Sequence, residues 1–300
     1  MKGKIVFLFS ILFVVAFQLH GVCADDLSPE KLIAAHLKSI GLRGASASQI
    51  KSIVFIGTAD ADLNQGIVAK MNGFASFVSQ GTKTSLVMKF PDPNYPEEHF
   101  AYDGKSVTVQ NIQPGIKTPF ADFIVVYNKI MKNGLLGGVF SNAWPLLDIK
   151  RSKPSFMEVS KKTVDKTELY MLEYRPKDRH GDMKIRMFFD QETFRHVRTE
   201  YKVSLNNDAS SGTYGDPDAD GDRDIPAIYG LGTGSTFYTL VEKFGNFKEV
   251  GPLTMPHSYE LDFELDGTAR SAFVGKWKIN VLQIGFNEEK IDQNLFKAKN

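Results

Sequence analysis

The sequence of 300 residues contains a single cysteine, Cys23, which lies close to the N-terminus. A chain with no second cysteine forms no internal disulfide bond. That excludes the small scaffolds of secreted proteins that depend on disulfides. The length suits one large domain or two small ones. We therefore expect a fold stabilised by a packed apolar core.

The sequence also lacks an excess of charge of either sign. Its 36 Lys and Arg residues face 35 Asp and Glu residues. Without Lys2 and Lys4, which precede the first apolar run, 34 basic residues remain against 35 acidic ones, a net charge of −1. Proteins that bind nucleic acids carry a clustered basic surface, so we expect no nucleic acid among the partners.

Only one long apolar run is present, and it lies near the N-terminus. Residues 5–17 follow two lysines and are interrupted by a single serine. The run is shorter than the roughly 20 residues of a membrane-spanning helix. The small residue Ala24 ends the segment, and this three-part pattern predicts a signal peptide over 1–24, cleaved after Ala24, and a periplasmic protein. A membrane anchor, or a lipid attached to Cys23, is the alternative, but the residue before Cys23 is not small.

Motifs that carry catalysis are missing as well. The stretch "GLGTGST" is rich in glycine, but it lacks the lysine and the strand-loop-helix context of a phosphate-binding loop and does not match a nucleophile elbow. His196 in "FRHVRTEY" could act as a general base, but no nucleophile motif accompanies it. We therefore expect neither an enzymatic activity nor a cofactor.

Alternation of apolar and polar residues dominates the rest of the chain. Blocks at 50–112, 154–205 and 234–287 alternate with period two and are interrupted by Gly, Asn and Asp turns, which is typical of strands. We count about ten or eleven strands with hairpin connections. This pattern predicts a mainly β fold with some helix, in which one antiparallel sheet is strongly curved or partly closed.

Two segments have helical spacing instead. In "DLSPEKLIAAHLKSIG", Ser28 is a suitable N-cap, Pro29 a suitable first residue, and Gly41 ends the apolar pattern, which predicts a helix of about three turns. His36 falls on the apolar face of this helix together with leucine and isoleucine side chains.

The second segment, residues 118–149, is much more apolar than its neighbours, and we call it the mid-chain segment. Thr118 and Pro119 predict a helix that runs to about Lys132. A glycine-rich turn follows, and then a short second helix that carries Trp144, Leu146 and Leu147. The apolar side chains of the first helix share one face: Phe120, Phe123, Ile124, Tyr127, Ile130 and Met131. The segment would cover the apolar face of the sheet, either as core or as a movable lid.

An acidic loop, "DPDADGDRD", lies within a Gly/Asp-rich stretch at 206–235. Its carboxylates match several positions of a calcium loop: Asp216, Asp218, Asp220, Asp222 and Asp224. Ala227 stands where a bidentate glutamate is required, and two prolines oppose flanking helices. We favour a hydrated loop, and an incomplete calcium site remains the alternative.

Several motifs in order along the chain resemble a known family. They are "LIAAHLKSIG", "IKSIVFIGTA", "NAWPLLDI", "FFDQETFRHVRTEY" and "FKEVGPLTMPHSYELDFE". Together they resemble the outer-membrane lipoprotein-sorting proteins, which are related to the periplasmic lipoprotein carrier and its outer-membrane receptor. The resemblance covers most of residues 32–296, although none of the motifs is a catalytic signature.

The resemblance implies a single domain over residues 25–300, built as an incomplete antiparallel β-barrel with a helical lid. It further implies a monomeric carrier that binds acyl chains of a lipoprotein or another lipid-like ligand in an apolar cavity, with envelope membrane proteins as donors or acceptors. With it, the mid-chain segment becomes the lid. We expect the ligand to be lined by Phe120, Phe123, Ile124, Tyr127, Ile130, Trp144 and Leu147. The alternative function is an envelope sensor or interaction module that binds another protein.

Arg195 is a further candidate for contact with the ligand. Strict alternation along "FRHVRTEY" puts Arg195 on the face of Tyr201, opposite the face of His196, Arg198 and Glu200. From an inward position its guanidinium could donate hydrogen bonds to carbonyl groups of the lid or to an ester of the ligand.

Overall fold

The computed structural model describes residues 27–42, 49–64, 68–149, 154–177, 183–207, 234–267 and 272–298. The predicted signal peptide and the five aspartates of the acidic loop lie outside the described residues. None of the helices in the described ranges is both long and apolar enough to cross a membrane.

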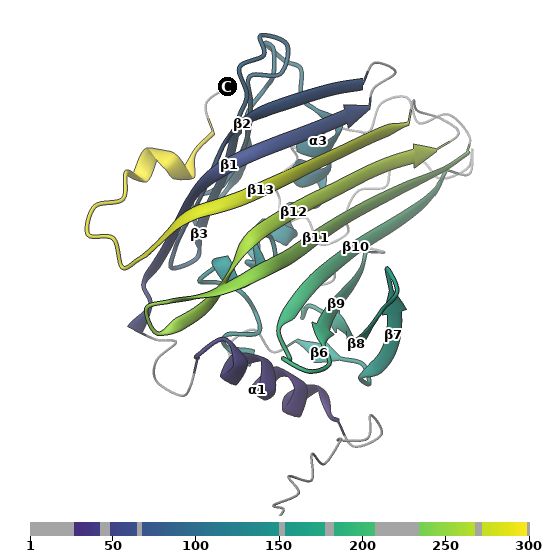
Figure 1. Ribbon diagram of the computed structural model, residues 1–300. Coiled ribbons are helices and arrows are strands. Elements are labelled where there is room, and N and C mark those ends of the chain that lie inside the picture. Colours follow the sequence, from purple (N-terminus) through teal and green to yellow (C-terminus); the bar gives the residue numbers. More distant parts are fainter. Residues whose placement is uncertain are drawn as a thin grey trace, which may run out of the picture.

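The described residues form one antiparallel sheet of 13 strands (Figure 1). The strands are β1 (Ser52–Asn64), β2 (Val68–Gln80), β3 (Lys83–Lys89), β4 (Glu97–Tyr102), β5 (Val107–Val109), β6 (Ser155–Phe156), β7 (Ser160–Val164), β8 (Thr167–Arg175), β9 (Lys184–Asp190), β10 (His196–Asn207), β11 (Gly234–Val250), β12 (Leu253–Gly267) and β13 (Phe273–Phe286). Their order is β5-β4-β3-β2-β1-β13-β12-β11-β10-β9-β8-β6, with β7 paired to β8.

The sheet is strongly curved and open, as the sequence predicted. Most strands pair with their neighbours in the chain, and β1 pairs with β13, so that the first and the last strand lie side by side in the middle of the sheet. There are more strands than the ten or eleven we expected, and two of them, β5 and β6, are only three and two residues long.

The N-terminal helix α1 (Pro29–Ser39) confirms the prediction from its sequence. The Ser28 side chain accepts a hydrogen bond from the backbone N–H of Lys31, and Pro29 occupies the first turn. Leu32, Ile33 and His36 are buried. The helix lies across one end of the sheet, near β6 and β9 (Figure 1).

The inner face of the sheet is the face that bears buried aromatic rings from most of the central strands, and we use that name below. Its largest side chains are Phe55, Phe77, Phe100, Phe263, Tyr201, Tyr259 and Trp277, all with almost no exposed surface. They alternate along the strands with more exposed residues of the outer face. The mid-chain segment covers the inner face; its helix α3 lies behind the front strands in Figure 1. On the other side, the 3₁₀-helix η3 (Gln293–Phe296) packs against β3 and β4 through Phe296, with Lys83 over its ring.

The mid-chain segment is less helical than we predicted. Thr118 caps α3 (Pro119–Val126) as expected, but the helix ends at Tyr127 and a separate turn of helix, α4 (Lys129–Lys132), follows. The Asn128 side chain donates a hydrogen bond to the carbonyl of Val125, and this local contact competes with continued helix.

The prediction of a second helix around Trp144 is also wrong. After the 3₁₀-helix η2 (Gly138–Phe140), the chain runs through successive turns closed by hydrogen bonds from Trp144 to Ser141 and from Leu147 to Trp144. Pro145 lacks the N–H that a continuing helix needs. The glycine-rich turn is confirmed: Gly134, Gly137 and Gly138 all have positive φ.

Candidate ligand-binding face

The predicted ligand-binding residues at the start of the mid-chain segment lie together on the inner face. Phe120 packs against Phe100, Phe263 and Trp277, with ring centroids 4.8, 5.1 and 5.0 Å away. Its side chain has no exposed surface. The first turn of α3 is therefore docked on an aromatic surface built from β4, β12 and β13.

The next helical turn continues this contact. Phe123 lies 5.6 Å from Tyr238 and 5.3 Å from Phe263, and Tyr127 packs on Phe123 at 5.0 Å. Ile124 and Ile130 are fully buried, whereas Tyr127 and Leu147 are half-buried. All these predicted residues thus share one apolar layer, although their role in binding stays a prediction.

Phe140 is a central residue that the sequence analysis did not single out. Its ring lies 4.7 Å from Phe55, 5.9 Å from Tyr259, 6.1 Å from Phe77 and 6.4 Å from Phe244. It belongs to η2, whose three residues are too few to show an amphipathic period. No signal in the sequence separated it from its apolar neighbours.

Trp144 lies at the other end of the segment, on two buried imidazoles. Its ring centroid is 5.3 Å from that of His36 and 5.1 Å from that of His196. His36 Nδ1 is 3.0 Å from the carbonyl oxygen of Phe194 and 3.2 Å from the backbone nitrogen of His196, so its tautomer decides whether it donates to the first or accepts from the second. His196 Nε2 lies 2.8 Å from Thr199 Oγ1.

Burial controls the charge of both imidazoles. It lowers the pKa of His36 to about 4, although the Phe194 carbonyl opposes this shift. It also lowers the pKa of His196 well below its usual value, and the neighbouring His36 adds to the effect. Both rings are therefore neutral near pH 7, and Trp144 rests on an uncharged surface.

A buried carboxyl group contacts the middle of the mid-chain segment. Glu242 of β11 has no exposed surface and accepts hydrogen bonds from the hydroxyl groups of Tyr201 at 2.7 Å and Tyr259 at 2.6 Å. The backbone N–H of Gly137 donates a third bond, 2.7 Å long. Burial raises the pKa of Glu242 to about 7 against the opposing effect of these three donors.

A second buried carboxyl group lies where the mid-chain segment begins. Tyr95 donates a hydrogen bond of 2.9 Å to Glu98 of β4 and accepts one of 3.0 Å from the indole N–H of Trp277. Burial raises the pKa of Glu98 to about 7, while the side chains of Thr118 and Tyr95 hold it down. Thr118 is also the N-cap of α3, so this cluster adjoins the start of the helix.

The sequence analysis missed both carboxyl groups, although a signal was present. In "FYTLVEKF", Glu242 is two residues from Leu240 and two from Phe244, so the three side chains share one face of the strand. In "EEHFAY", Glu98 shares a face with Phe100 in the same way. An acidic residue at an inward position of a strand with period two is expected to be buried and paired.

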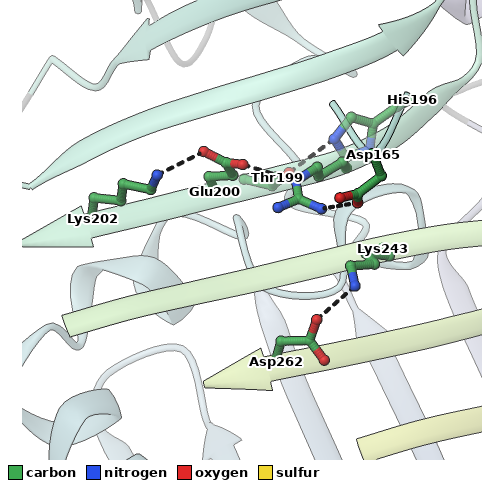
Figure 2. A network of polar contacts seen from close by, with 8 residues as sticks. Asp165, His196, Thr199, Glu200, Lys202, Lys243 and Asp262 are labelled. Atoms are coloured by element: carbon green, nitrogen blue, oxygen red, sulfur yellow. Dashed lines mark hydrogen bonds and ion pairs between the residues drawn. The ribbon is translucent and has the colours of Figure 1, made fainter. Parts of the chain in front are cut away.

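Strict alternation fails at the start of β10. A bulge between His196 and Arg198 turns His196 toward Trp144, whereas we had placed it on the face of Arg198 and Glu200. Arg198 donates a hydrogen bond of 2.9 Å from Nε to Glu200 and lies 3.4 Å from Asp165. Figure 2 shows Asp165 and Glu200 in this polar network. The bulge thus lets one strand carry a buried histidine and a partly buried ion pair on opposite faces.

Further ion pairs lie along the outer face. Lys202 lies 3.4 Å from Glu200, and on the adjacent strands Lys243 contacts Asp262 at 2.6 Å (Figure 2). The side chain of Glu200 is only 9% exposed, so this is no freely solvated pair. The contact between Arg198 and Asp165 connects β10 with the turn between β7 and β8.

Arg195 lies apart from the mid-chain contacts described above. Its guanidinium carbon is 5.3 Å from the centroid of the Phe247 ring on β11, a cation–π arrangement. A contact with a ligand ester remains a prediction for this residue. The five aspartates of the proposed calcium loop lie outside the described residues, within which no group of three or more His, Cys, Asp or Glu side chains could hold a metal ion.

The chain is similar in structure to several solved proteins. A domain described as a candidate outer membrane lipoprotein-sorting protein from Vibrio parahaemolyticus has a TM-score of 0.42 and 13% identity, over 89% of this chain and 96% of that one. A LolA superfamily protein from Nitrosomonas europaea has a TM-score of 0.43 and 12% identity, over 91% and 98%. MucB, solved in complex with MucA(peri), has a TM-score of 0.21 and 10% identity, over 84% and 93%.

No protein-family model matches the chain, and no curated protein matches it. The first two structural descriptions name the family that the sequence motifs resemble. Because identities are 10–13% and TM-scores lie below 0.5, we infer the function from this chain's own residues and not from these structures.

Proposed function

We propose that this chain is an exported carrier that reversibly binds the acyl chains of a lipoprotein, or another lipid-like ligand, on the inner face of its open sheet. The mid-chain segment would cover this face when the protein is empty and move aside when the ligand binds. No covalent chemistry is required. Membrane proteins of the envelope would deliver and accept the ligand.

The observation that carries this proposal is how the mid-chain segment covers the inner face. Phe120, Phe123 and Phe140 pack against aromatic rings of the sheet and are fully buried. The segment lies over the strands and adds no strand to the ladder. An acyl chain on the same aromatic surface would gain about 0.8 kcal/mol for each buried CH₂ group, so a long chain could replace the contacts of the segment.

Lipid analysis of protein purified from the periplasm tests the proposal. Native mass spectrometry should find a lipid-like molecule bound to a fraction of the protein, and added lipid should raise the melting temperature. An empty protein with no lipid-dependent stabilisation would contradict the carrier function. The mid-chain segment would then be ordinary core, and the interaction module would become the better account.

A matched pair of substitutions sharpens this test. Phe123→Glu puts a carboxylate at a position that is 1% exposed and that we predict to line the ligand, so a bound acyl chain would have to pack against a charged group. Phe74→Glu makes the same change at a position that is 72% exposed on β2. Circular dichroism checks that both variants keep their strands; we expect only Phe123→Glu to lose the bound lipid, and equal retention would argue against a lid.

A further inference from the structure

We propose that Glu242 is the polar subsite of the inner face, which selects apolar ligands whose neutral head group donates a hydrogen bond and rejects anionic head groups. This inference rests on the proposed function, because it concerns the ligand that replaces the mid-chain segment. The chemical class is an acyl chain joined to an N–H or O–H donor, such as an acyl amide.

Three hydrogen-bond donors converge on this carboxyl group, and they come from two different parts of the fold. The phenol groups of Tyr201 and Tyr259 belong to β10 and β12, which flank β11 in the sheet. The third donor is the backbone N–H of Gly137, which belongs to the mid-chain segment. When the segment moves, the two phenols stay with Glu242, and the donor from Gly137 departs.

The departure of that N–H leaves an acceptor that the ligand has to satisfy. A buried carboxylate oxygen without a donor carries a desolvation penalty, which a ligand offering an N–H or O–H at the same place removes. The surface around it is suited to an acyl chain, because the Tyr259 ring stacks on Phe244 at 5.3 Å and lies 6.4 Å from Phe55. Donor and apolar chain would thus bind at adjoining places.

The same carboxyl group disfavours an anionic head group. In the described part of the chain the contacts of Glu242 are two phenols and one amide, and none of them is a cation. Like charges at close range in a site of low dielectric constant repel strongly. Burial raises the pKa of Glu242 to about 7, so at pH 8 the group is mainly a carboxylate and this repulsion is present.

Three C16 probes of similar size separate these effects. N-Methylpalmitamide carries one N–H donor and no charge, methyl palmitate carries neither, and palmitate carries a negative charge. Displacement of an apolar fluorescent dye at pH 8 gives the affinity of each probe. For the unmodified protein we expect the amide to bind about tenfold more tightly than the ester, as for one hydrogen bond to a charged acceptor, and palmitate to bind most weakly.

Two substitutions test the two functions of the carboxyl group separately. Glu242→Gln keeps an acceptor oxygen but removes the charge, so palmitate should gain affinity relative to methyl palmitate. The amide should keep only part of its advantage over the ester, because a hydrogen bond to a neutral acceptor is weaker. Glu242→Leu removes the acceptor, so the amide should lose its advantage over the ester. Ratios of affinities within one variant cancel any change in how readily the mid-chain segment moves.

Glu260→Gln is the matched control. It makes the same change on β12, next to Tyr259, but on the outer face, where Glu260 lies 3.4 Å from Lys278. Its ranking of the three probes should equal that of the unmodified protein. Equal affinities for all three probes in the unmodified protein, or a ratio of palmitate to methyl palmitate affinity that Glu242→Gln leaves unchanged, would overturn the inference while the carrier function stands. If none of the probes binds, the proposed function itself fails.

Discussion

At the scale of single residues, buried ionisable groups of opposite kind contact the mid-chain segment. Glu98 and Glu242 have pKa values raised to about 7 by burial, whereas burial lowers the pKa of His36 to about 4. All three are therefore more easily kept neutral in the folded protein than in the unfolded chain. At pH 7 the imidazole is therefore neutral, and each of the two carboxyl groups is close to the midpoint of its titration.

These shifts have opposite consequences for stability. A carboxyl group whose pKa is raised on folding stabilises the protein fully below its unfolded pKa of about 4.5, and this contribution is lost as the pH rises through 7. An imidazole whose pKa is lowered on folding stabilises the protein above about 6.5, and this contribution is lost as the pH falls toward 4. Between pH 4.5 and 6.5 the two effects oppose each other.

Glu242→Gln should upset this balance. Without the carboxyl group, the loss of stability between pH 4.5 and 7 becomes smaller. We compare the free energy of unfolding at pH 8 minus that at pH 5 in the two proteins. This difference should be more positive in the variant by up to about 3 kcal/mol, since one pKa unit corresponds to about 1.4 kcal/mol. Urea unfolding at the two pH values measures this change. Identical pH profiles for the variant and the unmodified protein would show that Glu242 does not titrate in this range.

At the scale of elements, the glycine turn of the mid-chain segment is built for close contact. Gly137 has a φ of +85°, and a Cβ atom added to it would lie 2.6 Å from Cζ of Phe77. Phe77 is itself held by the ring of Phe55, whose centroid is 5.6 Å away, so it cannot easily yield. The turn therefore brings the Gly137 N–H to Glu242 by having no side chain.

Gly137→Ala should loosen this contact. The alanine suffers both an unfavourable left-handed backbone and a clash with Phe77, so the free energy of unfolding should fall by about 2–4 kcal/mol in urea unfolding. Gly81→Ala is the matched control, because Gly81 also has a positive φ, +59°, but no atom lies within 4 Å of its added Cβ. For Gly81→Ala the free energy of unfolding should fall by only about 1 kcal/mol. Equal losses for the two variants would mean that the turn is not tightly packed on Phe77.

Some features of the helices and strands could be predicted from the sequence, and others could not. Period two and the capping residues Ser28 and Thr118 predicted the strands and the starts of α1 and α3, because these depend on local chemistry. At the end of α3 the Asn128 side chain donates a hydrogen bond to the carbonyl of Val125, and His196 turns inward at a single bulge. Such features involve one residue each and leave no periodic signal.

At the scale of the whole molecule, an open curved sheet needs something to cover its inner face. Of the predicted ligand-binding residues, those of the mid-chain segment lie on that cover, since apolar spacing indicates burial. The buried partners Glu242, Tyr201 and Tyr259 come from three strands, and their meeting depends on the register of the sheet. Register between distant strands cannot be derived from the sequence of any one strand.

The carrier proposal requires that the mid-chain segment leaves the inner face when a ligand binds. The backbone nitrogen of Asn142 lies 2.8 Å from Oγ of Ser79 on β2, so these two positions connect the segment to the sheet. Cysteines introduced at both, in the chain from residue 25 onward, which has no cysteine of its own, can be joined by a disulfide or a short bifunctional thiol reagent. The link would hold the segment on the sheet.

Binding of N-methylpalmitamide to this double variant, before and after the link is formed, tests the account most directly. Each single-cysteine variant treated in the same way controls for the chemistry of the reagent. The account predicts that the reduced protein binds the probe, that the linked protein does not, and that reduction of a disulfide link restores binding. Equal binding by the linked and the reduced protein would contradict it, because the ligand would then bind without displacing the segment.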